Sequence, residues 1–354
     1  MNSFHVHQQF DREAWDSFVS SQASGHFMQS YGWGQLQLEL GWDVEYCVFG
    51  ETDIRATALV LSRRIPSTGM TVFYTPRGPT IDLTNQRLTS DFFTELKEHF
   101  SRRRGVFLRS DPYWPEPSES DGNLSLADLR HVPRDWSSWN APRFVFWLDL
   151  QRALDDVFKG MSSGCRNEVR RGYKNSVDFC LGGAHDLEDF HQLMVATGQH
   201  KGIAFRDADY YRLLFDTVGE SGDVQLFLGR FEDNVISAGV SVAYGDKAWL
   251  LYAASSPAHY KLRANRATQW EMIKWAHERG CHRYDFRGTA TNDPPRPEDP
   301  GYGVYRFKKG FGPTFTRLIG YYDLVQRPLA YRALRSAEDY GLPIAYRLRT
   351  WLQR

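Results

Sequence analysis

Asp111 is the residue whose type and position most directly suggest acid–base chemistry. It follows the apolar run VFLRS, and Pro112 prevents the expected strand from continuing. A carboxylate at the end of a strand can present a base to a cleft. The same position also suits an aspartate that only caps the turn before a proline, and the sequence leaves both interpretations open.

A cation and a phenol lie four residues apart in the stretch KGIAFRDADYY, at the start of an expected helix. Arg206 and Tyr210 would then share one face of that helix. Such a pair can clamp a phosphate or a carboxylate. It can equally be a surface cation packed on an aromatic ring, and the spacing does not separate the two.

Two basic stretches could meet a polyanion. In CRNEVRRGYK, the side chains of Arg166, Arg170 and Arg171 fall partly on one face of an expected helix. That face is either solvated or a stripe that follows a nucleic-acid backbone. In YRFKKGFGPTFT, Lys308 and Lys309 stand between aromatics and precede two glycines, which predicts a loop between domains.

The elements that would position these groups occur in the same order twice. Each half predicts a helix, antiparallel strands, a second helix that ends in Arg-Gly, and a strand that runs into a loop. We therefore expect an α+β chain of 354 residues to contain an internal duplication and two domains. The first copy comprises residues 11–24, 40–64, 91–105 and 106–112, and the second comprises 185–200, 223–256, 267–280 and 281–288.

Composition and missing motifs exclude several classes of protein. The formal net charge is zero, so a polyanion would have to meet a local basic patch. Scattered cysteines support neither a metal site nor a disulfide framework. No P-loop, nucleophile elbow or dinucleotide fingerprint is present, and KLRANRATQWEMIKWA lacks the glycine expected of an acetyl-CoA site. We expect no metal and no acetyl-CoA, and, without an apolar leader or span, a cytoplasmic chain. The cysteines are Cys47, Cys165, Cys180 and Cys281.

Eight stretches, in order and across nearly the whole chain, resemble the FemABX aminoacyltransferases. The resemblance implies two tandem GNAT-like domains, each a mixed, largely antiparallel sheet flanked by helices. They would span residues 1–147 and 148–320, with C-terminal helices at 321–354 packing back on the first. The coiled-coil arm inserted in larger members has no room here, so the chain resembles the compact FemX type. The stretches are QSYGWGQLQLELGW, YTPRGP, LRSDP, KGIAFRDADYY, WLLYAASS, QWEMIKWA, YDFRG and YRFKKGFG.

The resemblance also implies an activity. Family members transfer an amino acid from aminoacyl-tRNA to the side-chain amine of the third residue in the stem peptide of a peptidoglycan precursor. The donor is already an activated ester, so no ATP site is needed. The resemblance makes Asp111 the base or the group that positions the amine, and it places Phe307 and Lys308 at the aminoacyl end of the tRNA.

The acceptor's pyrophosphate and sugar match Arg206 and Tyr210, with Tyr252 nearby. Where relatives of the FemX type carry lysines, this chain has Gln35 and Gln37, which can donate a hydrogen bond to phosphate but add no charge. This departure favours a lipid-linked acceptor over a soluble UDP-linked one and leaves both open. A lipid-linked acceptor would bring the protein to the inner face of the membrane without spanning it.

The tRNA would need a basic surface, for which Arg166, Arg170, Arg171 and Lys309 are the candidates. We expect a monomer. Two alternatives to this function remain. One is an aminoacyl-tRNA-dependent acyltransferase of the same type that acts on a different amine, and the other is a non-catalytic scaffold that binds a cell-wall precursor.

Overall fold

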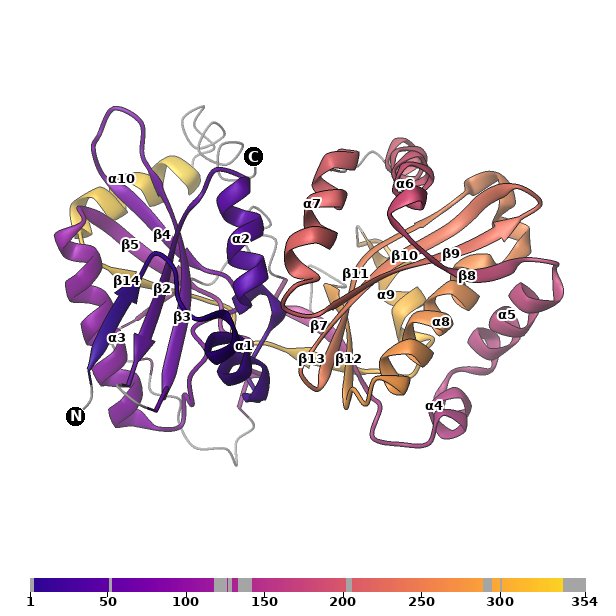
Figure 1. The fold of residues 1–354 in the computed structure, drawn as a ribbon, viewed down its shortest axis with the longest axis horizontal. Helices are drawn as coiled ribbons and strands as arrows, with labels where there is room; N and C mark the ends of the chain where they lie inside the picture. Colours follow the sequence, from indigo (N-terminus) through magenta and orange to yellow (C-terminus); the bar gives the residue numbers. More distant parts are fainter. Residues whose placement is uncertain are drawn as a thin grey trace. The chain divides into compact units, whose positions relative to one another are not determined.

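Two seven-stranded sheets organise the chain, one in each of two units (Figure 1). Unit 1 consists of Met1–Arg143 with Arg317–Arg354, and unit 2 consists of Phe144–Thr316. The units divide before the strand that begins at Phe144, rather than at 147 and 148, because that strand pairs within the sheet of unit 2. The computed structural model describes residues 3–50, 53–117, 126, 129–132, 142–201, 206–288, 295–299 and 301–339.

The sheet of unit 1 has the strand order β1-β2-β3-β4-β5-β14-β6. Neighbouring strands are antiparallel, except that β4 and β5 run parallel. The strands are β1 (Phe4–His7), β2 (Asp43–Phe49), β3 (Ala56–Arg64), β4 (Thr71–Thr75), β5 (Gly105–Ser110), β6 (Arg130–Val132) and β14 (Tyr321–Val325). The helices are α1 (Arg12–Ser21), the short η1 (Phe27–Gln29), α2 (Tyr31–Glu39), α3 (Gln86–Arg102) and α10 (Pro328–Asp339).

The sheet of unit 2 has the order β13-β7-β12-β11-β10-β9-β8, and here β11 and β12 are the parallel pair. Figure 1 shows α6 and α7 on one side of this sheet and α5 and α8 on the other. The strands are β7 (Phe144–Asp149), β8 (Asp178–Gly182), β9 (Asp223–Phe231), β10 (Asn234–Tyr244), β11 (Lys247–Ser255), β12 (Arg283–Gly288) and β13 (Thr314–Arg317). The helices are α4 (Leu154–Gly160), α5 (Ser163–Lys174), η3 (Ala184–Asp186), α6 (Leu187–Lys201), α7 (Ala208–Val218), η4 (Pro257–Leu262), α8 (Ala264–Glu278) and α9 (Tyr302–Lys309).

Both units repeat one chain path, so the predicted α+β duplication is confirmed. Strands β2, β3 and β4 are followed by α3 and the parallel strand β5, just as β9, β10 and β11 are followed by α8 and β12. Each sheet then receives an antiparallel strand from elsewhere in the chain, β14 beside β5 and β7 beside β12. The C-terminal segment therefore completes the sheet of unit 1.

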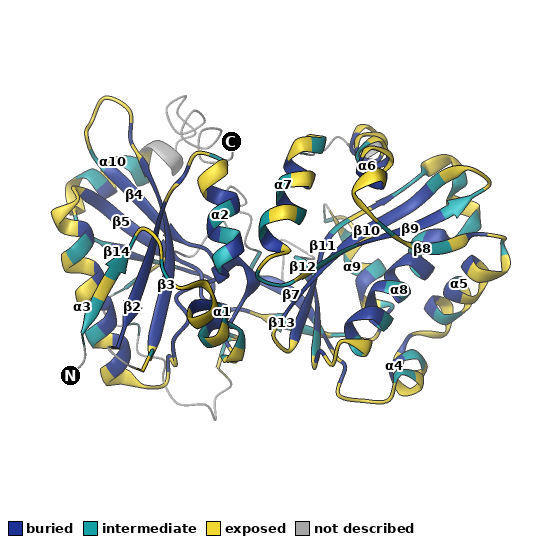
Figure 2. Cartoon of the chain, viewed as in Figure 1, coloured by how far each residue is buried: buried dark blue, intermediate teal, exposed yellow. Residues whose placement is uncertain are grey.

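Local sequence explains why the helices begin and bury one face where they do. Asp11 caps α1 by accepting a hydrogen bond from the Ala14 N–H at 2.7 Å, and Ser162 caps α5 through the Cys165 N–H at 3.2 Å. In α3, apolar residues recur every four positions and are all buried, which places that face on the sheet. Figure 2 shows the strands mainly buried and the outward sides of α5 and α7 exposed. The buried residues of α3 at this spacing are Leu88, Phe92, Leu96 and Phe100.

The parallel strands β11 and β12 of unit 2 stop pairing with each other before either strand ends. Within these described strands the β11–β12 ladder runs only from Lys247 and Arg283 to Trp249 and Asp285. Beyond that point β11 stays paired with β10 as far as Ser255, and β12 is paired with β7 at Gly288. The ends of β11 and β12 thus separate, and a crevice beyond the carboxyl ends of such strands is where many α/β proteins bind ligands.

Two segments differ from the expectation. The predicted loop at YRFKKG is wrong, because these residues form α9, a helix of unit 2 whose Lys308 is anchored on β12. The tail also begins with β14 rather than a helix, and its residues 340–354 lie outside those described. Among the described helices none is longer than α3, which has 17 residues.

Candidate functional site

Asp111 lies immediately after β5 and is 2% exposed. Its Oδ1 accepts a hydrogen bond from the Arg77 backbone N–H at 2.8 Å, and its Oδ2 lies 3.7 Å from Arg77 Nη1. Burial raises the pKa of this carboxyl to about 7, and the Arg77 charge and hydrogen bond act in the opposite direction. A carboxyl that titrates near neutral pH is suited to general base catalysis.

The turn after β4 holds the partner of Asp111. Arg77 has a φ of 56°, and its Nη2 donates to the Pro142 carbonyl at 2.8 Å. Gly78 is needed for close approach, because a Cβ there would lie 2.3 Å from Thr75 Oγ1 and 2.6 Å from the Gln29 amide carbon. Gln29 donates to the Pro76 carbonyl at 2.7 Å and accepts from the Leu59 N–H at 2.9 Å, so it fixes the turn.

Gln29 is a residue of this site that residue type and spacing alone do not indicate. It is fully buried at 0% exposure, and a glutamine directly before Ser-Tyr-Gly is the only local signal for it. A second unpredicted feature is the ion pair between Arg109 on β5 and Asp323 on β14. It is bidentate, with N–O distances of 2.8 and 2.7 Å, and Tyr331 also donates to Asp323 at 2.9 Å. The pair fixes β14 to β5, the strand that ends just before Asp111.

Lys308, in the last turn of α9, is 8% exposed. Its Nζ donates to the carbonyls of Phe286 at 2.7 Å and Gly288 at 2.5 Å, both on β12. Burial lowers the pKa of this amine to about 7, while the nearby Asp285 carboxylate acts in the opposite direction. Its neighbour Lys309 is exposed, and its amine lies 5.5 Å from the centre of the Tyr305 ring.

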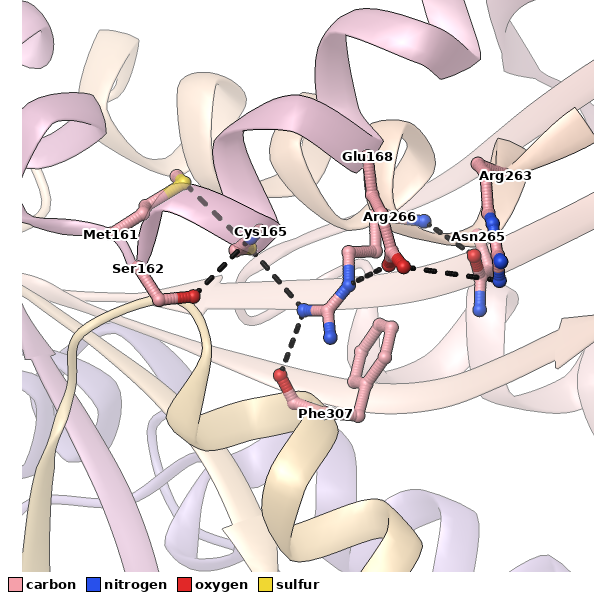
Figure 3. A network of polar contacts seen from close by, with 8 residues as sticks. All are labelled: Met161, Ser162, Cys165, Glu168, Arg263, Asn265, Arg266 and Phe307. Carbon is pink, nitrogen blue, oxygen red and sulfur yellow. Dashed lines mark hydrogen bonds and ion pairs between the residues drawn. The ribbon is translucent and has the colours of Figure 1, made fainter.

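Phe307 is partly exposed, and its ring lies 5.4 Å from that of Phe311. The carbonyl of Phe307 accepts a hydrogen bond from Arg266 Nη1 at 3.1 Å (Figure 3). The predicted catalytic pair of Phe307 and Lys308 therefore lies at the C-terminal end of one short helix. The two side chains differ in exposure, and Lys308 is the one directed at β12.

Arg206, Tyr210 and Tyr252 lie close together in unit 2, although Arg206 precedes α7 and does not share a helical face with Tyr210 as expected. The Arg206 guanidinium lies 5.0 Å from the centre of the Tyr210 ring, and the Tyr252 hydroxyl donates to the Tyr210 hydroxyl at 3.0 Å. Asp207 caps α7, so Arg206 lies just outside that helix. Burial raises the pKa of the Tyr252 phenol, which therefore stays protonated and can donate a hydrogen bond.

The two glutamines expected to contact substrate lie on α2. Gln35 donates to the Tyr46 hydroxyl at 3.2 Å and is partly exposed. Gln37 is 8% exposed. Between the two glutamines and Tyr31, the helix also packs closely through Gly34, where an added Cβ would lie 2.4 Å from the same Tyr46 hydroxyl. These contacts hold α2 against β2, and a role in binding substrate stays a prediction for both glutamines.

The three arginines of α5 have different surroundings. Arg166 donates to the Lys159 carbonyl at 2.8 Å and to that of Met161, so it ties α4 to α5. Arg170 is exposed and lies 5.3 Å from the centre of the Phe158 ring, and Arg171 is exposed as well. The last two are therefore the better placed for a polyanion, and tRNA binding stays a prediction for all three.

None of the described helices is both long and apolar enough to cross a membrane. In the same part of the chain, no group of three or more histidine, cysteine, aspartate or glutamate side chains could hold a metal ion. The predicted residues are divided between the units, with Asp111, Gln35 and Gln37 in unit 1 and the others in unit 2.

Known proteins are similar to this chain over most of its length. The model of the FemAB family matches residues 10–232 and 222–339. The lipid II:glycine glycyltransferase of Staphylococcus haemolyticus is 22% identical over 396 residues, covering 91% of this chain and 93% of the relative. The protein of the same name from Staphylococcus epidermidis RP62A is 23% identical over 390 residues, with the same two coverages.

Solved structures share the fold. The crystal structure of FemX superposes with a TM-score of 0.83 at 20% identity, covering 93% of this chain and 99% of that one. A tandem GNAT protein from the clavulanic acid biosynthesis pathway has a TM-score of 0.54 at 10% identity, also covering 93% and 99%. The expectation of two tandem GNAT-like domains is thereby confirmed.

Proposed function

The chain belongs to the FemAB family, and from this premise we propose that it is an aminoacyltransferase that acts on a peptidoglycan precursor. The observation that carries the proposal is the extent of the match. The family model covers residues of both units, and relatives named as lipid II:glycine glycyltransferases align over 91% of the chain. Lipid-linked precursor is accordingly the first acceptor to test, and a UDP-linked precursor is the second.

The donor in this proposal is an aminoacyl-tRNA, and the acceptor is the side-chain amine of the third stem-peptide residue. The amine nitrogen attacks the ester carbonyl, the new amide bond forms, and the ester bond to the terminal ribose breaks. An ammonium acceptor gives up one proton to a base and one to the departing ribose oxygen. Because the ester is already activated, the reaction needs no ATP, and we expect no metal or acetyl-CoA.

Asp111 is suited to take the first of these protons, because its pKa of about 7 lets it ionise near neutral pH. Lys308, when protonated, can offset the negative charge that develops on the ester carbonyl oxygen or near the tRNA 3′ end. Phe307 would contact the same aminoacyl end. Asp111 and Lys308 belong to different units, so the role proposed for each rests on its own surroundings.

The acceptor's diphosphate and sugar are assigned to Arg206, Tyr210 and Tyr252. A guanidinium with two phenols supplies charge-assisted and neutral hydrogen bonds to phosphate and hydroxyl oxygens. Gln35 and Gln37 would add neutral contacts at most. The tRNA backbone would meet Arg166, Arg170, Arg171 and Lys309, and this part of the proposal requires binding that weakens strongly with salt.

The test is incubation of the purified protein with a mixture of charged tRNAs and either lipid-linked or UDP-linked precursor, followed by mass measurement of the product. We expect the stem peptide to gain the mass of one or more amino-acid residues. Ribonuclease treatment of the donor should abolish the gain. If no stem peptide gains mass with either acceptor, the proposal is overturned in favour of a scaffold or of another amine as acceptor.

A further inference from the structure

Arg266, in the first turn of α8, is in contact with two other helices of unit 2 (Figure 3). Its Nη1 donates to the Phe307 carbonyl at 3.1 Å and to Cys165 Sγ at 3.2 Å. Its Nε donates to Glu168 Oε2 at 2.5 Å, in an ion pair whose side chains are 15% and 31% exposed. One guanidinium thus joins α8 to α5 and α9.

These contacts hold the last turn of α9, where helix carbonyls lack partners within the helix. A cation is favourable at this end because the helix dipole is negative there. The guanidinium also lies 4.7 Å from the centre of the Phe307 ring and 5.4 Å from that of Phe311. The Phe307–Lys308 segment is therefore held from two sides, by Arg266 at its carbonyl and by β12 at the Lys308 amine.

The neighbouring residues leave room for this arrangement. A Cβ on Gly310 would lie 2.8 Å from Arg266 Nη1 and 3.4 Å from the Cys165 Cβ. Gly310 has a helical φ of −58°, so a Cβ there would displace the Arg266 guanidinium rather than strain the backbone. The Gly310 carbonyl in turn accepts from the N–H of Ser162, the residue that caps α5.

We propose that Arg266, held in place by Glu168, is a positioning residue that fixes Lys308 and couples it to α5, the helix that carries Arg166, Arg170 and Arg171. Arg266 touches no reacting atom in this proposal. Its effect passes through the Phe307 carbonyl and ring to the residue that follows. The catalytic consequence rests on the proposed function, whereas the positioning itself does not.

The kinetic test compares Arg266→Gln and Arg266→Lys with a matched control. Displacing a catalytic group by about 1 Å can cost roughly 100-fold in rate, so we expect kcat to fall by between about 10-fold and 100-fold in Arg266→Gln. The KM values for donor and acceptor should stay within about 2-fold, because their contacts remain. Arg266→Lys should recover only part of the loss, since lysine lacks the planar fork and the stacking.

Arg230→Gln is the control, because it breaks a comparable ion pair elsewhere in unit 2. Arg230 lies 2.6 Å from Asp186 Oδ1, with side chains 28% and 8% exposed, and neither residue is assigned a part in the reaction. We expect a similar loss of stability and an unchanged kcat. If kcat falls equally in both glutamine variants, Arg266 has only a structural role and the inference is overturned.

A second readout needs no activity. Competitive acetylation with acetic anhydride, followed by peptide mass spectrometry, reports how accessible and how protonated Lys308 is at each pH. We expect Lys308 to react at least about 3-fold faster in Arg266→Gln and at the wild-type rate in Arg230→Gln, because only the first loosens α9. An unchanged rate in Arg266→Gln overturns the inference. A faster rate supports it even if wild type modifies no stem peptide, and that result would count against the proposed function alone.

Discussion

Replacing Asp111 with asparagine should make the protein both less active and more stable at alkaline pH. Asparagine keeps the shape of the side chain and can still accept the Arg77 N–H hydrogen bond, which spans 2.8 Å in wild type. It cannot ionise. Loss of a general base costs roughly 100-fold or more in rate. The stability gain follows from the burial of the wild-type carboxylate.

The magnitude comes from the pKa of this carboxyl, which rises from 3.8 to about 7 because the group is buried. The folded protein therefore binds the proton more tightly than the unfolded chain. The free energy of unfolding then falls by about 1.4 kcal/mol for each pH unit between these two pKa values. Between pH 5 and pH 8 the wild type should lose roughly 2 to 3 kcal/mol relative to Asp111→Asn.

The assay is urea unfolding of both proteins at pH 5 and pH 8, with hydrogen exchange of the β5 amides to report on unit 1 separately. Asp246→Asn is the control, because its carboxyl has a lowered pKa and is ionised at both pH values. Its effect on stability should change by no more than about 1 kcal/mol between pH 5 and pH 8, because the contact of Asp246 with His282 is half-exposed and such ion pairs contribute that much at most. If the stability difference between wild type and Asp111→Asn does not grow with pH, Asp111 is not a buried carboxyl of raised pKa.

Three further predictions concern activity and binding. The pH profile of kcat/KM should be a narrow bell centred near pH 7, because the ionised form of Asp111 appears and the charged form of Lys308 disappears as pH rises through their pKa values of about 7. A broad plateau from pH 6 to 9 would contradict it. Arg206→Ala should raise the KM for the precursor about 10-fold to 100-fold, with tRNA affinity unchanged, because a charge-assisted phosphate contact is lost. Filter binding of tRNA to the double variant Arg170→Gln, Arg171→Gln should show that the slope of log binding constant against log salt concentration is shallower by about 1 to 2. An unchanged slope would exclude both arginines as phosphate contacts.

Secondary structure was predictable where local pattern decides it. The helix and strands of each repeat were found because apolar spacing and turn residues mark them over short windows. Strand β14 was missed, because the partner that makes YYDLV a strand is β5, more than 200 residues earlier. The Arg109–Asp323 pair that joins these strands spans 214 positions. No local window contains both partners, so a tail rich in arginine was read as helical.

The two adjacent lysines show why a site is harder to predict than a fold. Lys308 and Lys309 are residues of one type in the same short stretch, and their helical phase differs by about 100°. Phase is meaningful only once residues 302–309 are known to form a helix, and two glycines made this stretch look like a loop. The family resemblance had selected Lys308 on other grounds, and the structure independently makes Lys308 the buried lysine with a pKa of about 7. The pH dependence of Lys308 acetylation measures directly whether the lysine that the family resemblance indicates also has the lowered pKa that its burial predicts.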